Sequence, residues 1–120
     1  MTAHGRPPLS ELDIAIRLYR LRRRRETQFG AIFGEPAWDI LLDLFIVAGR
    51  GKRISVTGLC AAAAVPPTTA LRWVDKLAAQ GALLLEADAG DRRRVHVSLA
   101  PDMLARMGML LRSFGQDLLR

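Results

Sequence analysis

Arginine is the residue type whose spacing in this sequence most clearly suggests a chemical role. Three consecutive arginines, Arg92, Arg93 and Arg94, follow a run of turn-forming residues at positions 88–91 (Asp-Ala-Gly-Asp). A guanidinium group donates several hydrogen bonds to phosphate, and in the narrow minor groove of DNA it meets a strongly negative potential. This cluster therefore favours a surface that binds a polyanion. The alternative is a charged loop that is only solvated.

A second group of polar side chains lies on one face of a helix predicted over residues 68–80. Thr68, Thr69 and Arg72 are close together at helical spacing. Hydroxyl and guanidinium groups form hydrogen bonds with base edges and with phosphates. This face is therefore a candidate for contact with DNA, although the same residues on a bare helix surface would be unremarkable.

Each of two further basic clusters has two possible roles. Arg20 and the four arginines at positions 22–25 can form a charged helix face whose aliphatic stems cover apolar surface, or they can contact phosphates. Arg53 follows Arg50 and Lys52 just before a predicted helix, where a DNA backbone often passes. Phosphate contact and simple solvation are equally supported for Arg53.

The sequence offers little that could perform catalysis or bind a metal. The single cysteine, Cys60, excludes an intramolecular disulfide framework and a zinc site of several cysteines. We expect it to be a small buried residue, with a redox switch as the alternative. We expect His96 at the surface or near DNA. No carboxylate pair, nucleophile triad or cluster of metal ligands stands out, so we expect no enzyme, no cofactor and no metal.

Length and composition set the frame for these residues. The chain has 120 residues, of which half are hydrophobic, and its formal net charge is +6. This predicts one domain over residues 10–120, with a flexible tail over residues 1–9. The positive charge again favours a polyanionic partner. Since no run of about 20 apolar residues and no signal peptide is present, we expect a soluble, cytoplasmic protein without membrane contact.

Apolar periodicity and helix- and turn-forming residues predict the elements that position these side chains. They are helices over residues 10–29, 36–48, 56–64, 68–80 and 101–119, a short strand at Ile54, and strands over residues 83–86 and 95–99. The predicted fold class is mostly α with a small β-hairpin.

This order of elements is the winged helix-turn-helix arrangement, with the helix-turn-helix at residues 55–81 and the wing at residues 83–99. The second helix of such a pair fits the major groove of DNA, where its early side chains reach base edges. The wing lays its arginines against phosphates or into the minor groove.

Several motifs within residues 54–99 also match a known family. They are Ser55 and Leu59, then Val65, Thr68, Thr69, Arg72, Val74-Asp75-Lys76-Leu77 and Gly81, then Asp91-Arg92-Arg93 and Val97-Ser98-Leu99. In these positions the stretch resembles the MarR (multiple antibiotic resistance regulator) type of transcription factor. Lys76 lies within this motif.

The resemblance implies a DNA-binding role for individual residues. It implies that Thr68, Thr69 and Arg72 meet DNA on the recognition helix, that Arg93 reaches the minor groove and that Asp91 supports the wing. The full expected set of DNA contacts is Arg53, Thr68, Thr69, Arg72, Lys76, Arg92, Arg93 and Arg94. Whether a small-molecule effector acts on the protein stays open.

The terminal helices indicate a second copy of the chain as a partner. Leu12, Ile16 and Tyr19 form an apolar stripe on the first helix, and Met107, Leu110, Leu111 and Phe114 form another on the last. Stripes of this size usually find a partner, and the simplest is a two-fold homodimer. The alternative is that both helices pack into their own core.

We therefore predict a homodimeric transcriptional regulator that binds specific double-stranded DNA. The alternative function is a winged helix that serves as a protein-interaction or dimerisation module and has no DNA site of its own.

Overall fold

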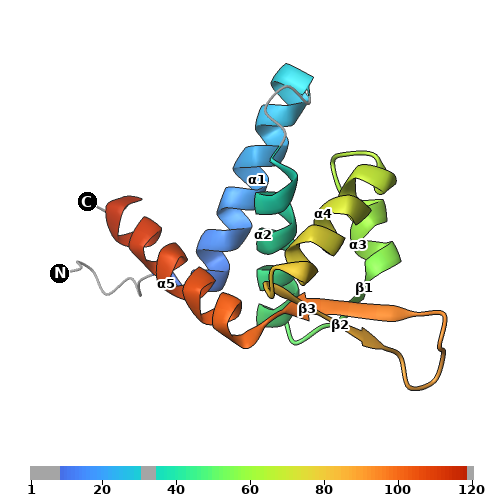
Figure 1. Cartoon of the computed structure of the whole chain (residues 1–120). Coiled ribbons are helices and arrows are strands. Elements are labelled where there is room, and N and C mark those ends of the chain that lie inside the picture. The colour runs from blue at the N-terminus through green and yellow to red at the C-terminus, as the bar shows by residue number, and fades with distance from the viewer. Residues whose placement is uncertain (1–8, 31–34, 119–120) are drawn as a thin grey trace.

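The computed structural model describes residues 9–30 and 35–118 (Figure 1). Its elements are α1 (Glu11–Phe29), α2 (Pro36–Gly49), β1 (Ile54–Ser55), α3 (Val56–Ala62), α4 (Pro67–Ala79), β2 (Leu83–Ala87), β3 (Val95–Leu99) and α5 (Pro101–Leu118). The predicted fold class and order of elements are confirmed, with boundaries that differ by one or two residues. The predicted tail at residues 1–9 lies outside the described residues except for Leu9, and so does the expected helix end at Leu119.

Helix α1 begins where its sequence predicts. The Ser10 hydroxyl accepts a hydrogen bond from the Asp13 backbone N–H at 3.1 Å, and the Asp13 carboxylate reaches back to the Ser10 backbone N–H. This capping box satisfies N–H groups that the first helical turn cannot pair. At the other end Gly30 has a φ of +73°, a left-handed conformation that glycine adopts without steric cost.

The helix-turn-helix is formed by α3 and α4. The Ser55 hydroxyl accepts a hydrogen bond from the Gly58 backbone N–H at 3.0 Å, so Ser55 caps α3 as predicted. Helix α4 begins at Pro67, where the missing N–H of proline costs no helical hydrogen bond. Ala70, Val74 and Leu77 are buried, which leaves the opposite face of α4 towards solvent.

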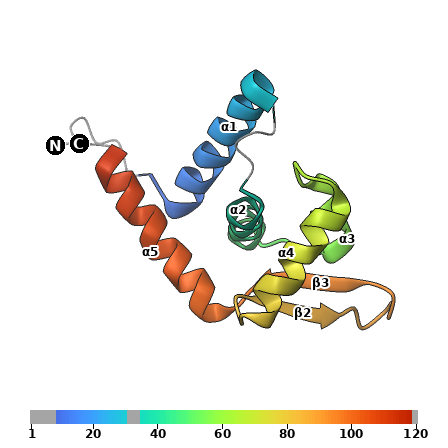
Figure 2. The same ribbon diagram turned by 45° about the horizontal axis from the view of Figure 1, so that its top comes forward.

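The strands form one antiparallel sheet in the order β1-β3-β2. Val97 of β3 lies between Ile54 of β1 and Leu85 of β2 in this register. Strands β2 and β3 are the two arms of the wing, and their connecting loop at residues 88–94 points away from the terminal helices (Figures 1 and 2).

Helix α2 lies in the middle of the fold, with α1 on one side and α3, α4 and the sheet on the other (Figure 2). Leu42 and Leu44 of α2 are among the largest fully buried side chains of the fold. Helix α5 leaves the sheet and packs its far half against α1, where Gly115 lies against Ile14.

The apolar stripe predicted on the first helix is less exposed than expected. Leu12, Ile16 and Tyr19 are half-buried and pack against the core, and on α5 Met107 and Leu111 are buried. A different set of large apolar side chains on these two helices is exposed. It comprises Leu21 and Phe29 of α1 and Leu104, Met109, Leu110 and Leu118 of α5.

The length and hydrophobicity of the helices can be compared with what a membrane-spanning helix needs. Among residues 9–30 and 35–118, no helix combines the length and the apolar character needed to cross a bilayer.

Candidate nucleic-acid interface

The outer face of α4 presents the predicted recognition residues to solvent. Thr68 and Arg72 are exposed and Thr69 is half-buried. Within the part of the chain that the structure describes, the Arg72 guanidinium makes no hydrogen bond or ion pair, so it is available to a ligand. The ammonium group of Lys76 lies over the Trp73 ring, 4.7 Å from its centroid, and this cation–π contact holds Lys76 against the same face.

The amino end of α4 is open to an anion. Pro66 offers no side-chain cap, and the first backbone bond of the helix runs from the Ala70 N–H to the Pro66 carbonyl. The N–H groups of Thr68 and Thr69 therefore have no partner within the helix and point out of its amino end. Such groups, with the positive end of the helix dipole, bind phosphate.

The wing loop is closed by the backbone and presents its arginines outwards. The Asp88 N–H donates to the Arg94 carbonyl at 2.8 Å, and the Asp91 carboxylate accepts a hydrogen bond from the Arg93 N–H at 3.0 Å. The Arg93 side chain is 94% exposed, with its Nε 3.6 Å from Asp91, and Arg92 and Arg94 are exposed as well. Asp91 thus lies where a residue that supports the wing would lie.

The wing loop and the start of α3 enclose an open hollow of about 430 Å³. Arg93 and Arg94 border it from the wing, Ser55 borders it as the N-cap of α3, and Thr57 borders it from the first turn of that helix. Thr57 is not among the DNA contacts predicted from the sequence. It is exposed in the first turn of the helix that opens the helix-turn-helix, and it borders the same hollow as two predicted DNA contacts.

Arg53 is exposed next to the sheet, and its guanidinium lies 3.4 Å from the Glu86 carboxylate. Because both side chains are largely exposed, this ion pair is weak and leaves Arg53 able to exchange partners.

The arginine run at positions 20–25 is largely used inside the chain. The side chain of Arg22 is 11% exposed and binds Asp39 and, at 2.8 Å, Glu35. Arg25 contacts Glu35 at 3.2 Å. The hydrogen bonds from Arg22 and Arg25 lower the pKa of Glu35, so this carboxylate stays charged. These contacts tie α1 to the start of α2.

Arg23 extends this network to the helix-turn-helix. It binds Glu26 at 2.9 Å, its guanidinium lies 4.7 Å from the centroid of the Tyr19 ring, and its Nη2 lies 3.4 Å from the Ala62 carbonyl at the end of α3. For Arg22, Arg23 and Arg25 the structure therefore favours packing within the fold, one of the two interpretations left open by the sequence.

For two residues outside the predicted interface, the prediction of burial or exposure is confirmed for one and wrong for the other. Cys60 is buried as predicted, and burial raises the pKa of its thiol. His96 does not lie at the surface: its side chain is 16% exposed and its Nε2 is 3.0 Å from an Asp88 carboxylate oxygen. The register of the sheet, which the sequence did not reveal, places this histidine at the base of the wing.

A cavity of about 320 Å³ separates α1 from the helix-turn-helix. Its wall includes Tyr19 and Arg20 of α1, Asp43 of α2 and Arg50 at the end of α2. Burial raises the pKa of Asp43 to about 6, and among the described residues its carboxylate makes no hydrogen bond or ion pair. Within residues 9–30 and 35–118, no group of three or more histidine, cysteine, aspartate or glutamate residues could hold a metal ion.

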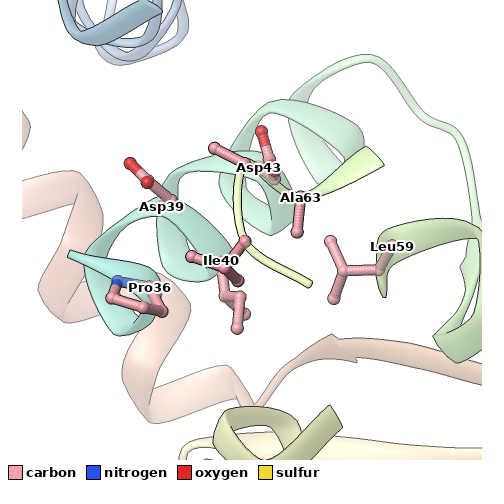
Figure 3. A pocket seen from close by; sticks show the side chains of 8 residues that line it. Pro36, Asp39, Ile40, Asp43, Leu59 and Ala63 are labelled. Atoms are coloured by element: carbon pink, nitrogen blue, oxygen red, sulfur yellow. The ribbon is translucent and has the colours of Figure 1, made fainter. Parts of the chain in front are cut away.

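Asp43 also borders a second, much smaller hollow (Figure 3). Figure 3 shows Asp43 and Ile40 of α2 opposite Leu59 and Ala63. This space has a volume of about 10 Å³, which is room for about one water molecule and no larger ligand.

Comparisons by sequence alone found no matching protein-family model and no matching curated protein. Comparisons of structure found clear matches. A mutant of MarR from E. coli has a TM-score of 0.57 at 19% identity, over 86% of this chain and 75% of that one. MepR from S. aureus, in a DNA-binding conformation, has a TM-score of 0.56 at 15% identity, over 88% and 76%.

A third match is BpsR from Bordetella bronchiseptica, whose DNA binding is regulated by 6-hydroxynicotinic acid. Its TM-score is 0.51 at 20% identity, over 85% of this chain and 74% of that one. The chain therefore has the winged helix fold of MarR-type transcriptional regulators.

Proposed function

We propose that the protein is a transcriptional regulator that binds specific double-stranded DNA as a homodimer. The observation that carries this proposal is a contrast between two sets of arginines. Arg22, Arg23 and Arg25 of α1 are bound to acidic groups or carbonyls of the chain. Arg72, Arg92 and Arg94 face solvent on α4 and the wing and make no such contact with the described residues.

In the proposed complex, α4 enters the major groove. The amides and hydroxyls of Thr68 and Thr69 contact phosphate at the groove edge, and Arg72, one turn further, reaches a base edge. Lys76 contacts the backbone at the far end of the helix. The exposed face of α4 and the open amino end of that helix support these assignments.

The wing supplies the second set of contacts. Arg93 inserts into the minor groove while Asp91 holds the loop, and Arg92 and Arg94 contact phosphates. Arg53 exchanges its weak pairing with Glu86 for a phosphate. Thr57 adds a hydroxyl on the α3 side of the hollow that the wing borders.

A second copy of the chain would cover the exposed apolar side chains of α1 and α5. Leu104, Leu110 and Leu118 flank the buried face of α5, and Leu21 and Phe29 lie exposed on α1. Helix α5 packs one face against α1, β3 and the Trp38 ring of α2, while Leu104, Leu110 and Leu118 remain exposed. A two-fold dimer through these helices would set the two copies of α4 about 34–36 Å apart, one turn of B-DNA.

The test of this function is a salt titration of binding to random duplex DNA, followed by selection of bound sequences from a random duplex library. We expect affinity to fall steeply and linearly on a log–log plot as salt rises, because phosphate contacts release counterions. We also expect the selected sequences to be pseudo-palindromic. Absence of salt-dependent DNA binding would instead favour the winged helix as a protein-interaction module.

We also infer that a small ligand in the cavity between α1 and the helix-turn-helix regulates DNA binding. The supporting observation is the cavity itself, whose apolar wall carries Tyr19, Arg20, Asp43 and Arg50. A ligand that bound there would change how α1 sits against the lobe that carries α4. BpsR, whose DNA binding responds to 6-hydroxynicotinic acid, has the same fold.

The first probes for this cavity are 6-hydroxynicotinic acid and benzylamine, which differ in charge. Binding by either one should raise the melting temperature of the protein and change its affinity for DNA, and the variant Ala62→Leu, which narrows the cavity, should reduce both effects. An unchanged response in Ala62→Leu would place the ligand elsewhere.

A further inference from the structure

One side-chain pair joins three parts of the wing base. His96 Nε2 on β3 lies 3.0 Å from one carboxylate oxygen of Asp88, the first residue after β2. The other carboxylate oxygen of Asp88 accepts a hydrogen bond from the Gly90 N–H at 2.7 Å. The Asp88 backbone N–H in turn donates to the Arg94 carbonyl at 2.8 Å. Asp88 therefore connects β3, the tip of the loop and the arginine run.

His96 occupies a sheltered position at this base. In the register of the sheet it lies opposite Glu86 on β2 and Ser55 on β1. It borders a small hollow together with Lys52 and Arg53, while α2 contributes only apolar residues there. The charged groups around the ring are therefore Lys52, Arg53, Glu86 and Asp88, and Asp88 alone makes a hydrogen bond with it among the described residues.

Protonation of His96 would change the charge of the pair. The hydrogen bonds from the Gly90 N–H and from His96 lower the pKa of Asp88, so this group is a carboxylate throughout the range in which proteins are usually studied. A histidine side chain ordinarily changes charge between about pH 5 and 8. A neutral ring with its proton on Nε2 donates a hydrogen bond to Asp88, and an imidazolium donates the same bond with charge assistance, which is shorter and stronger.

The wing arginines depend on the loop because their side chains have little else to hold them. Arg93 is 94% exposed, and its contact within the loop is with Asp91. The direction in which Arg92, Arg93 and Arg94 leave the backbone is therefore set by the loop conformation. A loop that is already ordered loses less conformational entropy when it binds DNA, so its order contributes directly to affinity.

We propose that His96 is a positioning residue for DNA binding: through Asp88 it fixes the loop that presents the wing arginines, and its protonation strengthens that hold. This inference rests on the DNA-binding function proposed above. It predicts tighter binding at pH 6 than at pH 8, because the charged ring both orders the wing and adds a positive charge next to it.

The first experiment measures the wing without DNA. Hydrogen exchange at the Gly90 amide is followed by NMR in the wild-type protein and in His96→Val, His96→Gln and Asp88→Ala. Valine suits a strand but cannot donate, whereas glutamine places an N–H near the position of Nε2 and cannot become charged. We expect exchange to be about tenfold faster in His96→Val and in Asp88→Ala, and to stay within about twofold of wild type in His96→Gln.

The second experiment measures affinity for a duplex at pH 6 and pH 8 at constant ionic strength. We expect the wild-type protein to bind about three- to tenfold more tightly at pH 6 and His96→Gln to lose most of this difference. Other groups also change charge in this range, among them His4 and Asp43, whose pKa is about 6. His4→Gln and Asp43→Asn are therefore the matched controls, and both should keep the wild-type pH dependence.

The outcomes separate this inference from the proposed function. Wild-type exchange at Gly90 in His96→Val would overturn the positioning role of His96, even if Asp88→Ala exchanged faster, and so would a wild-type pH dependence in His96→Gln. If the wild-type protein bound no DNA while Gly90 exchange responded as expected, the proposed function would be wrong and the pair would still hold the wing. Thermal unfolding of each variant identifies any that fails to fold, and Asp88→Ala leaves the strand itself unchanged.

Discussion

Arg93 and Arg72 illustrate how exposure and location assign different tasks to the same side chain. Arg93 extends from a loop that lies outside the core, whereas Arg72 lies on a rigid helix that is buried along its opposite face. A flexible, exposed guanidinium contributes charge to any sequence, and a guanidinium fixed on a helix can distinguish one base from another.

We predict that Arg93→Ala weakens binding to every duplex and lowers the slope of log affinity against log salt by about 1. The measurement is a salt titration with a random and a selected duplex. Arg24→Ala is the matched control, since Arg24 is exposed on α1, outside the proposed interface, and makes no hydrogen bond or ion pair with the described residues. An unchanged slope in Arg93→Ala would remove Arg93 from the DNA contacts.

We predict that Arg72→Ala changes sequence preference at one position of each half-site, with a loss of about 1–3 kcal/mol for the preferred base. The measurement is affinity for a set of duplexes that differ at single base pairs. A loss of the same size for every duplex would show that Arg72 contacts phosphate.

Asp43 provides a prediction about stability and pH. Its pKa is raised by burial from 3.8 to about 6, so between about pH 4 and pH 6 the folded chain holds a proton that the unfolded chain has lost. The free energy of unfolding contributed by this group therefore falls as pH rises through that window. We expect Asp43→Asn to be more stable than wild type at pH 7 by about 2 kcal/mol, and the gain to shrink towards pH 4. Urea denaturation of both proteins at pH 7 and pH 4 measures this difference. Equal stability of Asp43→Asn and wild type at pH 7 would contradict the prediction.

At the scale of elements, the junction of α5 with α1 depends on the absence of a side chain at Gly115. A Cβ at this position would lie 2.4 Å from Ile14 Cδ1, and Ile14 is itself buried in the core. At Gly108, about two turns earlier in the same helix, a Cβ would meet only Phe45, at 4.0 Å. The two glycines thus form a matched pair.

We predict that Gly115→Ala lowers the free energy of unfolding by about 1–3 kcal/mol because it overpacks the junction. Gly108→Ala should leave stability unchanged or raise it by up to about 1 kcal/mol, because alanine favours a helix more than glycine does. Denaturant unfolding of both variants checks this. Equal effects would show that Ile14 moves aside at little cost.

Local signals account for the elements that the sequence predicted well. The capping residues Ser10 and Ser55 and the helix-starting prolines Pro36 and Pro67 act on their immediate neighbours, so their effects can be read from short stretches. The exposed face of α4 follows in the same way from the spacing of its apolar residues.

Contacts between distant parts of the chain account for what the sequence did not reveal. The partners of Arg22 lie 13 and 17 residues away, and the carbonyl bound by Arg23 lies 39 residues away. Whether an arginine is free or paired depends on such contacts. The same holds for His96, whose neighbours are set by the sheet register, and for the cavity, which exists only where three helices meet.

At the scale of the whole molecule, α5 and α1 leave the body of the fold as two arms with apolar side chains in solvent (Figure 2). If a second copy covers these side chains, dimerisation and DNA binding are linked. A dimer that contacts both half-sites of a duplex binds far more tightly than a monomer that contacts one half-site.

We predict that Leu110→Glu combined with Leu118→Glu converts a dimer to a monomer in light scattering and lowers affinity for a two-half-site duplex by at least about tenfold. Ser113→Glu, on the same helix, is the control for added charge. A monomeric wild-type protein, or a dimeric double variant, would show that these leucines do not form the interface.

The reach of Arg23 has a mechanical consequence. One guanidinium connects α1, where we propose that a second copy docks, with the Ala62 carbonyl at the end of α3, which precedes the proposed recognition helix α4. A tilt of α1 would therefore pull on the end of α3. If two copies dock through α1, a change in how they contact each other would reach the proposed recognition helices in part through this side chain.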